Sequence, residues 1–202
     1  MGTFGMMKNK GYIIAGLEVE NQSIIFTNMH LPHGNSNKTR RLKALNSLLT
    51  QIETHERFKS FDVGFVLGDF NFRCHIDKEV LHRILKNVKF DFNKLKPFDE
   101  YYERADKENL PVIKHKKMES VDEKLRKLKE QAITFPPTYK YEMKANTYRI
   151  SYKHTPSYTD RIFHMKSNKD VLIEPICYSS CFDLYGSDHK PVYAQYQIRL
   201  PN

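Results

Sequence analysis

The chain has little of what marks secreted and membrane-spanning proteins. No run approaches the roughly 18 to 20 consecutive apolar residues that a membrane-spanning helix needs, and residues 1–30 lack the basic and then apolar segments of a secretory leader. Residues 199–202 form no prenylation motif. The three cysteines, Cys74, Cys177 and Cys181, are too sparse for a disulfide framework and complete no zinc site, which favours a reducing compartment. We therefore expect a cytoplasmic protein.

Internal repeats, low-complexity tracts and a clear domain linker are also absent from the sequence. A length of 202 residues with 40% hydrophobic content suits one α/β domain with its own core. The formal net charge is +9, from 33 Lys and Arg against 24 Asp and Glu. This charge favours an anionic partner, which could be nucleic acid, a phosphorylated small molecule or an anionic membrane leaflet.

The apolar periodicity predicts a mixed α/β chain. Residues 38–55 carry leucines at helical spacing, and Asp77 is a candidate N-cap for a second helix. Ser120 and Glu123 form a capping-box pattern for a third helix. The expected strands are residues 12–19, 23–29, 62–68, 161–165, 171–178 and 190–198, and the first two read as a hairpin.

The stretch from Phe65 to Arg73 joins an apolar run to three polar side chains. After Gly68, the residues Asp69, Asn71 and Arg73 stand at alternate positions. Alternate residues of a strand share a face, so we expect the three side chains to project together. They would offer one reacting group a proton acceptor, an orienting amide and a phosphate-binding cation. The alternative is a strand that simply ends in an Asp/Asn turn.

Further polar residues stand where predicted strands meet loops. Taken singly, His30 could be a core histidine, Asp160 a partner of Arg161, and Asp188-His189 a turn. Taken together, they supply a general base, a histidine with a carboxylate to orient it, and cations for phosphate. No serine or cysteine nucleophile with its own base is evident, so direct attack by water is favoured. Carboxylates without a Cys/His cluster suit Mg²⁺ better than zinc.

Six ordered motifs make the chain resemble a known family. The motifs are NKG at 9–11, NMHL at 28–31, GDFNFR at 68–73, FPPTYKY at 135–141, TPSYTDR at 155–161 and SDHKPV at 187–192. In this order the motifs resemble the inositol polyphosphate 5-phosphatase domain of the endonuclease/exonuclease/phosphatase superfamily, and their wording is nearest to the type IV, pharbin-like enzymes. The resemblance runs from Gly5 to about Gln197.

The resemblance implies one α/β (α+β) domain over residues 1–202, built as a DNase I-like two-sheet β-sandwich flanked by helices. It also implies Mg²⁺-dependent removal of the 5-phosphate from phosphoinositides or inositol polyphosphates, by a protein peripheral at membranes. The family's domain begins upstream of this chain, with a strand Asn and a Glu that holds the Mg²⁺. We therefore expect an N-terminally truncated domain that is weakly active or inactive, and that needs the missing segment or a partner to complete its sheet.

The motif match also assigns roles to individual residues. Asp69 would activate the attacking water, and the other catalytic residues would be Asn71, His30, Asp160 and His189. Substrate would be bound by Lys10, Arg73, Tyr139, Lys140, Lys153 and Arg161, with Tyr139 and Lys140 beside the 4-phosphate. Asp188 would lie beside the metal.

One departure from the family pattern concerns the residues before the TPSYTDR motif. The family has Lys-x-Arg there, whereas His154 replaces the arginine in this chain and a one-residue gap is needed to align Lys153 with the lysine. The resemblance further implies an apolar membrane-contacting tip at Met6 and Met7.

Two other functions are compatible with the sequence. A nuclease of the same superfamily would also suit a charge of +9, and a non-catalytic phosphoinositide-binding module would keep the anion pocket. The motifs at 135–141 and 155–161 favour the phosphatase, so we expect no nucleic-acid partner.

Overall fold

The computed structural model describes residues 9–85, 91, 94–102, 123–151 and 154–199. Several sequence predictions fall outside these residues. They are the apolar tip at Met6 and Met7, the substrate-binding role of Lys153 and the cap at Ser120.

The larger sheet has five strands in the order β1-β2-β3-β5-β4. Strands β1 (Gly11–Val19) and β2 (Gln22–His30) pair antiparallel, which confirms the predicted hairpin. Strand β3 (Val63–Asp69) runs parallel to β2 and antiparallel to β5 (Asp160–Lys166). The short strand β4 (Lys129–Glu130) closes the far edge beside β5.

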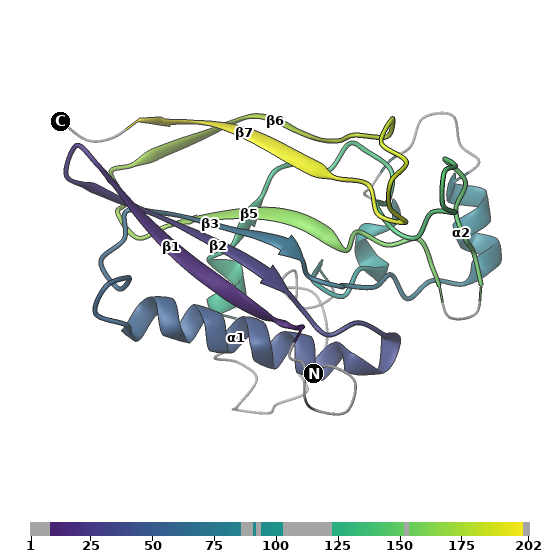
Figure 1. The fold of residues 1–202 in the computed structure, drawn as a ribbon, viewed down its shortest axis with the longest axis horizontal. Helices are drawn as coiled ribbons and strands as arrows, with labels where there is room; N and C mark the ends of the chain where they lie inside the picture. Colours follow the sequence, from purple (N-terminus) through teal and green to yellow (C-terminus); the bar gives the residue numbers. More distant parts are fainter. Residues whose placement is uncertain (1–8, 86–90, 92–93, 103–122, 152–153, 200–202) are drawn as a thin grey trace.

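Helix α1 (Lys38–Thr54) covers one face of this sheet, and α2 (Lys78–Leu85) lies beyond the ends of its strands (Figure 1). Helix α1 follows a 3-10 turn at Asn35–Asn37, and its apolar stripe packs into the main core. Helix α2 begins after Asp77, whose Oδ1 accepts the backbone N–H of Glu79 at 2.8 Å, so the predicted cap is confirmed. A further 3-10 turn spans Lys96–Phe98, and residues 123–126 form a single helical turn. None of the described helices is long and apolar enough to cross a membrane.

The opposite face is covered by a second sheet of two antiparallel strands, β6 (Leu172–Ser180) and β7 (Val192–Arg199). Val63 and Phe65 of β3 meet Val171 and Tyr196 there in a second core. Figure 1 shows the resulting layers, with β6 and β7 on one side of the large sheet and α1 on the other. The predicted two-sheet sandwich with flanking helices is therefore confirmed.

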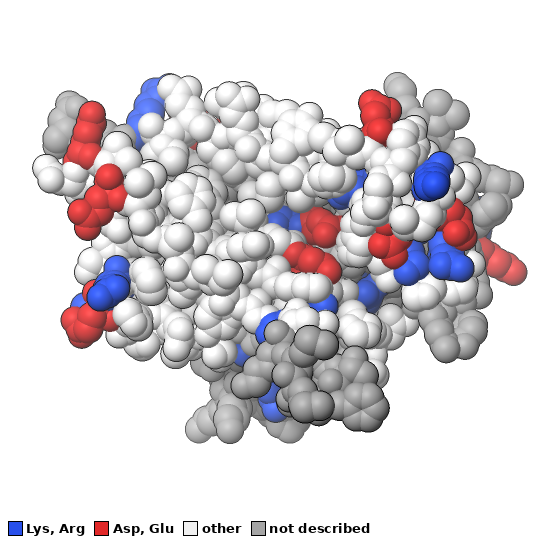
Figure 2. Space-filling model, in the orientation of Figure 1, with Lys and Arg blue, Asp and Glu red and all other residues white. Residues whose placement is uncertain are grey.

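The inner face of the sandwich is only partly covered over β1 and β2. Phe26 stacks on Phe65 with ring centroids 5.4 Å apart, so both rings lie on the inner face. Phe26 is nevertheless 41% exposed, and Ile13 and Leu17 of β1 are 73% and 51% exposed. Figure 2 shows that this side of the molecule carries few charged residues over β1 and β7. Apolar surface of this kind normally marks a contact region.

Candidate active site

Three predicted catalytic residues lie in one row across the large sheet. His30 ends β2, Asp69 ends β3 and Asp160 begins β5, and the strand register pairs His30 with Asp69 and Asp69 with Asp160. Residues that are paired in register share a face of the sheet. Segments far apart in the sequence therefore bring a histidine and two carboxylates to one edge.

Gly68 permits the close approach of β3 to β2 at this edge. Its φ is +125°, and a Cβ atom there would lie 2.1 Å from the backbone oxygen of Met29. Only glycine fits such a position.

The prediction that Asp69, Asn71 and Arg73 share the face of one strand was wrong, although the three side chains do lie together. Strand β3 ends at Asp69, and Asn71 adopts a φ of 53°. A turn brings the side chains together instead. The backbone N–H of Asn71 donates to Asp69 Oδ1 and its Nδ2 donates to Oδ2, both at 2.9 Å. Arg73 Nη2 in turn donates to Asn71 Oδ1 at 2.6 Å. The polar cluster and the Asp/Asn turn are thus one feature.

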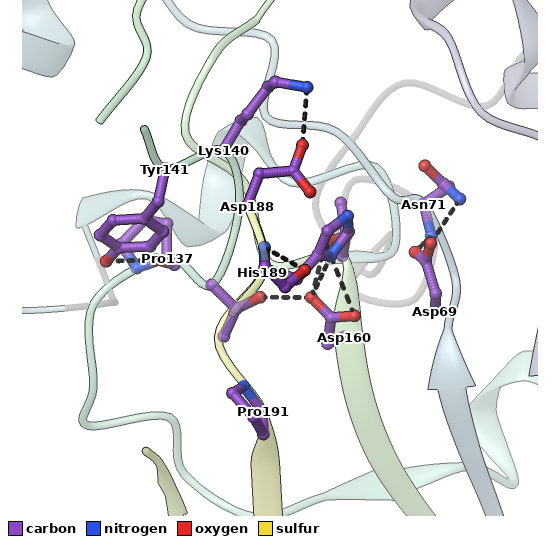
Figure 3. Close-up of polar contacts among 12 residues, drawn as sticks. Asp69, Asn71, Pro137, Lys140, Tyr141, Asp160, Asp188, His189 and Pro191 are labelled. Atoms are coloured by element: carbon purple, nitrogen blue, oxygen red, sulfur yellow. Dashed lines mark hydrogen bonds and ion pairs between the residues drawn. The ribbon is translucent and has the colours of Figure 1, made fainter. Parts of the chain in front are cut away.

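Asp160 holds His189 beside the row. His189 Nδ1 lies 2.9 Å from Asp160 Oδ2, and the same oxygen accepts hydrogen bonds from the hydroxyls of Thr138 and Thr159 at 2.9 and 2.8 Å. The loop of His189 is fixed by backbone pairing, since the N–H of Lys190 donates to Thr138 O at 2.8 Å. Figure 3 shows His189 between Asp160 and Asp188, with Asp69 and Asn71 on the far side of the Asp160–His189 pair. The role of Thr138 was not predicted from the sequence, although this residue stands inside the FPPTYKY motif.

Charge and burial shift the pKa values in this cluster. Burial, and then the charge of Asp160, raise the pKa of Asp69. Burial lowers the pKa of His189, but the hydrogen bond to Asp160 and the three nearby carboxylates outweigh it, so its pKa lies above the ordinary value. Burial and the adjacent Lys10 lower the pKa of His30. Opposed shifts in adjacent groups are typical of an acid–base site.

Lys10 is placed beside the catalytic row. Its ammonium contacts His30 Nε2, which lies 3.2 Å from Asp69 Oδ2. Burial lowers the pKa of Lys10, and although the charge of Asp69 raises it, the pKa stays below its ordinary value.

The carboxylates of the row could hold a metal ion. Ligand atoms of Asp69, Asp160 and His189 all lie within 4.8 Å of one another. The contact of His189 Nδ1 with Asp160 leaves Nε2 of the same ring as a possible donor beside the two carboxylates, and the carboxylate oxygens suit a hard divalent cation. Asp188 is instead paired with Lys140, whose Nζ lies 2.7 Å from its Oδ2. Its role as a metal ligand stays a prediction.

A cavity of about 500 Å³ lies beside the catalytic row. It is lined by His33, Gly34, Asn35, Ser36, Arg73, Tyr139 and His154. The Arg73 guanidinium lies 4.5 Å from the centroid of the Tyr139 ring, which itself lies 4.4 Å from that of His189. Arg73 is only 5% exposed, makes no ion pair within the described part of the chain, and leaves its Nε without a hydrogen-bond partner. A buried cation without an anion is costly, so this cavity suits an anionic group.

The predicted role of Arg161 in substrate binding was wrong. Its side chain is fully buried, with Nη1 2.8 Å from Asp99 Oδ1 and Nε 3.0 Å from Glu130 Oε1. Two carboxylates therefore already satisfy the guanidinium, and no surface is left for an anionic ligand. Arg161 holds β5 to β4 and to the segment at 99–100.

A two-sheet sandwich that carries a carboxylate with an orienting amide, a histidine–carboxylate pair and buried cations is typical of phosphoester hydrolases. The chain belongs to the endonuclease/exonuclease/phosphatase family 2, whose family model matches residues 1–195. The predicted superfamily is thereby confirmed.

The names of two similar proteins state that they are phosphatases of inositol lipids. A polyphosphatidylinositol phosphatase of Saccharomyces cerevisiae is 33% identical over 204 residues, covering 98% of this chain and 17% of that protein. The phosphatidylinositol polyphosphate 5-phosphatase type IV of Mus musculus is 31% identical over 144 residues, covering 69% of this chain and 20% of that protein.

The fold is also that of a solved phosphatase domain. The inositol polyphosphate 5-phosphatase domain of a synaptojanin, in complex with inositol (1,4)-bisphosphate and a calcium ion, matches with a TM-score of 0.71 and 27% identity. The match covers 93% of this chain and 50% of that one. The chain thus spans about a fifth of these curated relatives and half of the solved domain.

Proposed function

We propose that the chain is part of a Mg²⁺-dependent phosphomonoesterase that removes the 5-phosphate from phosphoinositides or inositol polyphosphates by direct attack of water. The observation that carries the proposal is the placement of Asp69 beside the Asp160–His189 pair, next to a cavity lined by a buried arginine that has no ion-pair partner among the described residues. The names of the similar proteins supply the substrate class.

Asp69 is the candidate base for the attacking water. Its raised pKa brings the carboxylate closer to the range in which general bases work well. Asn71 fixes its orientation through two hydrogen bonds. A water held by Asp69 would therefore be positioned as well as activated.

The cations around the row would neutralise the phosphoryl group. His189, whose protonated form is stabilised by its contact with Asp160, and Lys10 with His30 lie on either side of Asp69. Phosphoryl transfer depends on positioning and charge neutralisation more than on covalent chemistry.

Mg²⁺ would be held by the carboxylates of Asp69 and Asp160, with Asp188 close by. When bound, the ion would supply positive charge for the transferred phosphoryl group.

The cavity would take the neighbouring 4-phosphate. Tyr139 and Arg73 line it, and Lys140 follows Tyr139 in the motif that implied this contact. The guanidinium of Arg73, whose Nε has no hydrogen-bond partner, gives such a phosphate a buried cation.

The substrate's location and the completion of the fold are also part of the proposal. A peripheral, cytoplasmic association with membranes would bring the site to lipid substrates, and the net charge of +9 supports it. The uncovered inner face at Ile13 and Leu17 supports completion of the sandwich by a further segment or partner. We therefore expect weak turnover by the 202-residue chain alone.

The test is phosphate release with Mg²⁺ or with EDTA, from soluble inositol 1,4,5-trisphosphate and from vesicles that contain phosphatidylinositol 4,5-bisphosphate. Inositol 1,4-bisphosphate, which has no 5-phosphate, is the control substrate. The chain alone and a chain extended by the coding sequence upstream of Met1 are compared, and the extended chain should be faster by orders of magnitude. Cleavage of plain or abasic DNA would favour a nuclease, and binding without release by both chains would favour a binding module.

A further inference from the structure

Behind the cavity lies an ion pair that no solvent reaches. Arg41 of α1 donates from Nη2 to Glu100 Oε1 at 2.6 Å and from Nε to Oε2 at 2.9 Å. Both side chains are 0% exposed. This is the forked, two-bond arrangement in which an arginine binds a carboxylate most specifically.

Arg41 also holds one wall of the cavity. Its Nη1 donates to the backbone oxygens of Pro32 at 2.9 Å and Gly34 at 2.7 Å. These two residues flank His33, and the segment from His33 to Ser36 lines the cavity. The same segment continues from His30 at the end of β2, so Arg41 fixes the path by which the chain leaves the catalytic row.

Glu100 holds the opposite wall. Its backbone N–H donates to the oxygen of Arg73 at 3.0 Å, and the N–H of His75 donates to Phe98 O at 2.8 Å. Glu100 Oε1 also lies 2.9 Å from His75 Nε2. The segment at 98–100 therefore runs beside residues 73–75 and fixes Arg73, the buried cation of the cavity.

We infer that Arg41 and Glu100 are a positioning pair that sets the separation of the two cavity walls, and so the selectivity for ligands with a second anionic group. Neither side chain can touch a ligand, because both are fully buried. The inference rests on the proposed function for the identity of the ligand, an inositol carrying neighbouring phosphates. The pair joins the loop after β2 to the segment after β3, which no other described ion pair does.

Replacing Arg41 with lysine keeps the charge and removes the fork. The guanidinium of Arg41 donates hydrogen bonds from three nitrogens to four oxygen atoms. The ammonium of a lysine would donate from a single nitrogen. The variant Arg41→Lys should therefore loosen the walls without leaving Glu100 uncompensated. Arg40→Lys is the matched control, because Arg40 is the neighbouring residue of α1 and is exposed.

The first measurement is calorimetric binding of inositol 1,4,5-trisphosphate and of inositol 5-monophosphate. Arg41→Lys should weaken binding of the trisphosphate roughly tenfold, because displacement of the cavity walls would cost the ligand about one charge-assisted hydrogen bond to Arg73. Binding of the monophosphate should change much less, and Arg40→Lys should change neither. An equal loss for both ligands, or no difference between the two variants, would overturn the inference.

The second measurement is independent of any ligand. Hydrogen exchange of backbone amides should become faster in Arg41→Lys at residues 33–37 and 98–101, and stay unchanged in β2 and β3. Unchanged exchange in those segments would overturn the positioning role, whether or not the wild type binds an inositol phosphate. Failure of the wild type to bind any inositol phosphate would overturn the proposed function instead. If Arg41→Lys does not fold, Glu100→Gln, which keeps the side-chain size, is subjected to the same two measurements.

Discussion

Asp69 and Asp160 stand directly opposite each other in the antiparallel register of β3 and β5. Like charges in that position destabilise a sheet. The hydrogen bonds of Asn71 to Asp69, and those of Thr138 and Thr159 to Asp160, offset part of this cost. Burial, and then the charge of Asp160, raise the pKa of Asp69, and a bound cation would relieve the repulsion between the two carboxylates.

Asp69→Ala should abolish turnover in an active form of the enzyme while leaving substrate binding largely intact. The expected loss in kcat is about 10² to 10⁴, the typical contribution of a general base. Steady-state kinetics and a direct binding measurement test this, with Asp170→Ala at an exposed position as the control. If Asp69→Ala kept more than a tenth of the wild-type kcat, Asp69 would have no place in the mechanism.

Thr138→Val should lower kcat without changing the overall fold. Valine removes the hydroxyl that donates to Asp160 Oδ2 and leaves the buried shape nearly unchanged. The loss of one hydrogen bond to a charged group is worth about 1.5 to 3 kcal/mol, so a reduction of roughly ten- to a hundredfold is expected. The exposed Thr134→Val is the control, and equal rates in the two variants would show that Thr138 does not orient Asp160.

The sequence predicted the candidate site best where the site residues lie close together in the chain. The cluster of Asp69 and Asn71 was predictable because both residues belong to one turn, although its geometry depends on Gly68 and on the φ of Asn71 rather than on strand alternation. The strands and α1 were likewise predictable from local apolar patterns. The register that places His30 beside Asp69 could not be read in this way, because register follows from the packing of whole strands.

Long-range ion pairs were the main features that sequence reasoning missed. Arg73 and Arg161 both stand in phosphatase-like motifs, yet only Arg73 lines the cavity. The partners of Arg161 are 62 and 31 residues away, and those carboxylates decide its role. The carboxylate that pairs with Arg41 is 59 residues away. The sequence of α1 indicates only that a charged residue stands at a buried position, and it does not indicate the partner.

Arg161→Met should therefore destabilise the domain rather than weaken ligand binding. Removing the guanidinium leaves the buried carboxylates of Asp99 and Glu130 without their partner, which typically costs about 3 to 5 kcal/mol. Urea unfolding measures the loss, and Arg149→Met, at a half-exposed surface ion pair, is the control. A stable Arg161→Met protein that binds inositol phosphate poorly would restore Arg161 to the substrate site.

The uncovered inner face should make the 202-residue chain prone to association. Ile13 and Leu17 expose apolar side chains on an edge strand, which is a template for pairing with other chains. The double variant Ile13→Thr, Leu17→Thr should remain monomeric at higher concentration, as measured by light scattering. If a completing segment normally covers this face, the same variant should bind that segment less well. Wild-type chain that stays monomeric and binds no apolar dye would contradict the need for completion.

Glu100→Gln should reduce stability at neutral pH and lose that effect in acid. Burial raises the pKa of Glu100, but the hydrogen bonds and charges of His75 and Arg41 outweigh it, so its pKa lies below the ordinary value of 4.5. A carboxyl with a depressed pKa stabilises the folded state above its unfolded pKa, and this contribution disappears as the pH falls through the lower, folded pKa. The difference in unfolding free energy between the wild type and Glu100→Gln should therefore be large at pH 7 and should shrink below about pH 4.5. Urea unfolding at several pH values measures it, with the exposed Glu56→Gln as the control. A difference that stays constant down to pH 3 would show that the ionised form of Glu100 is not what Arg41 stabilises.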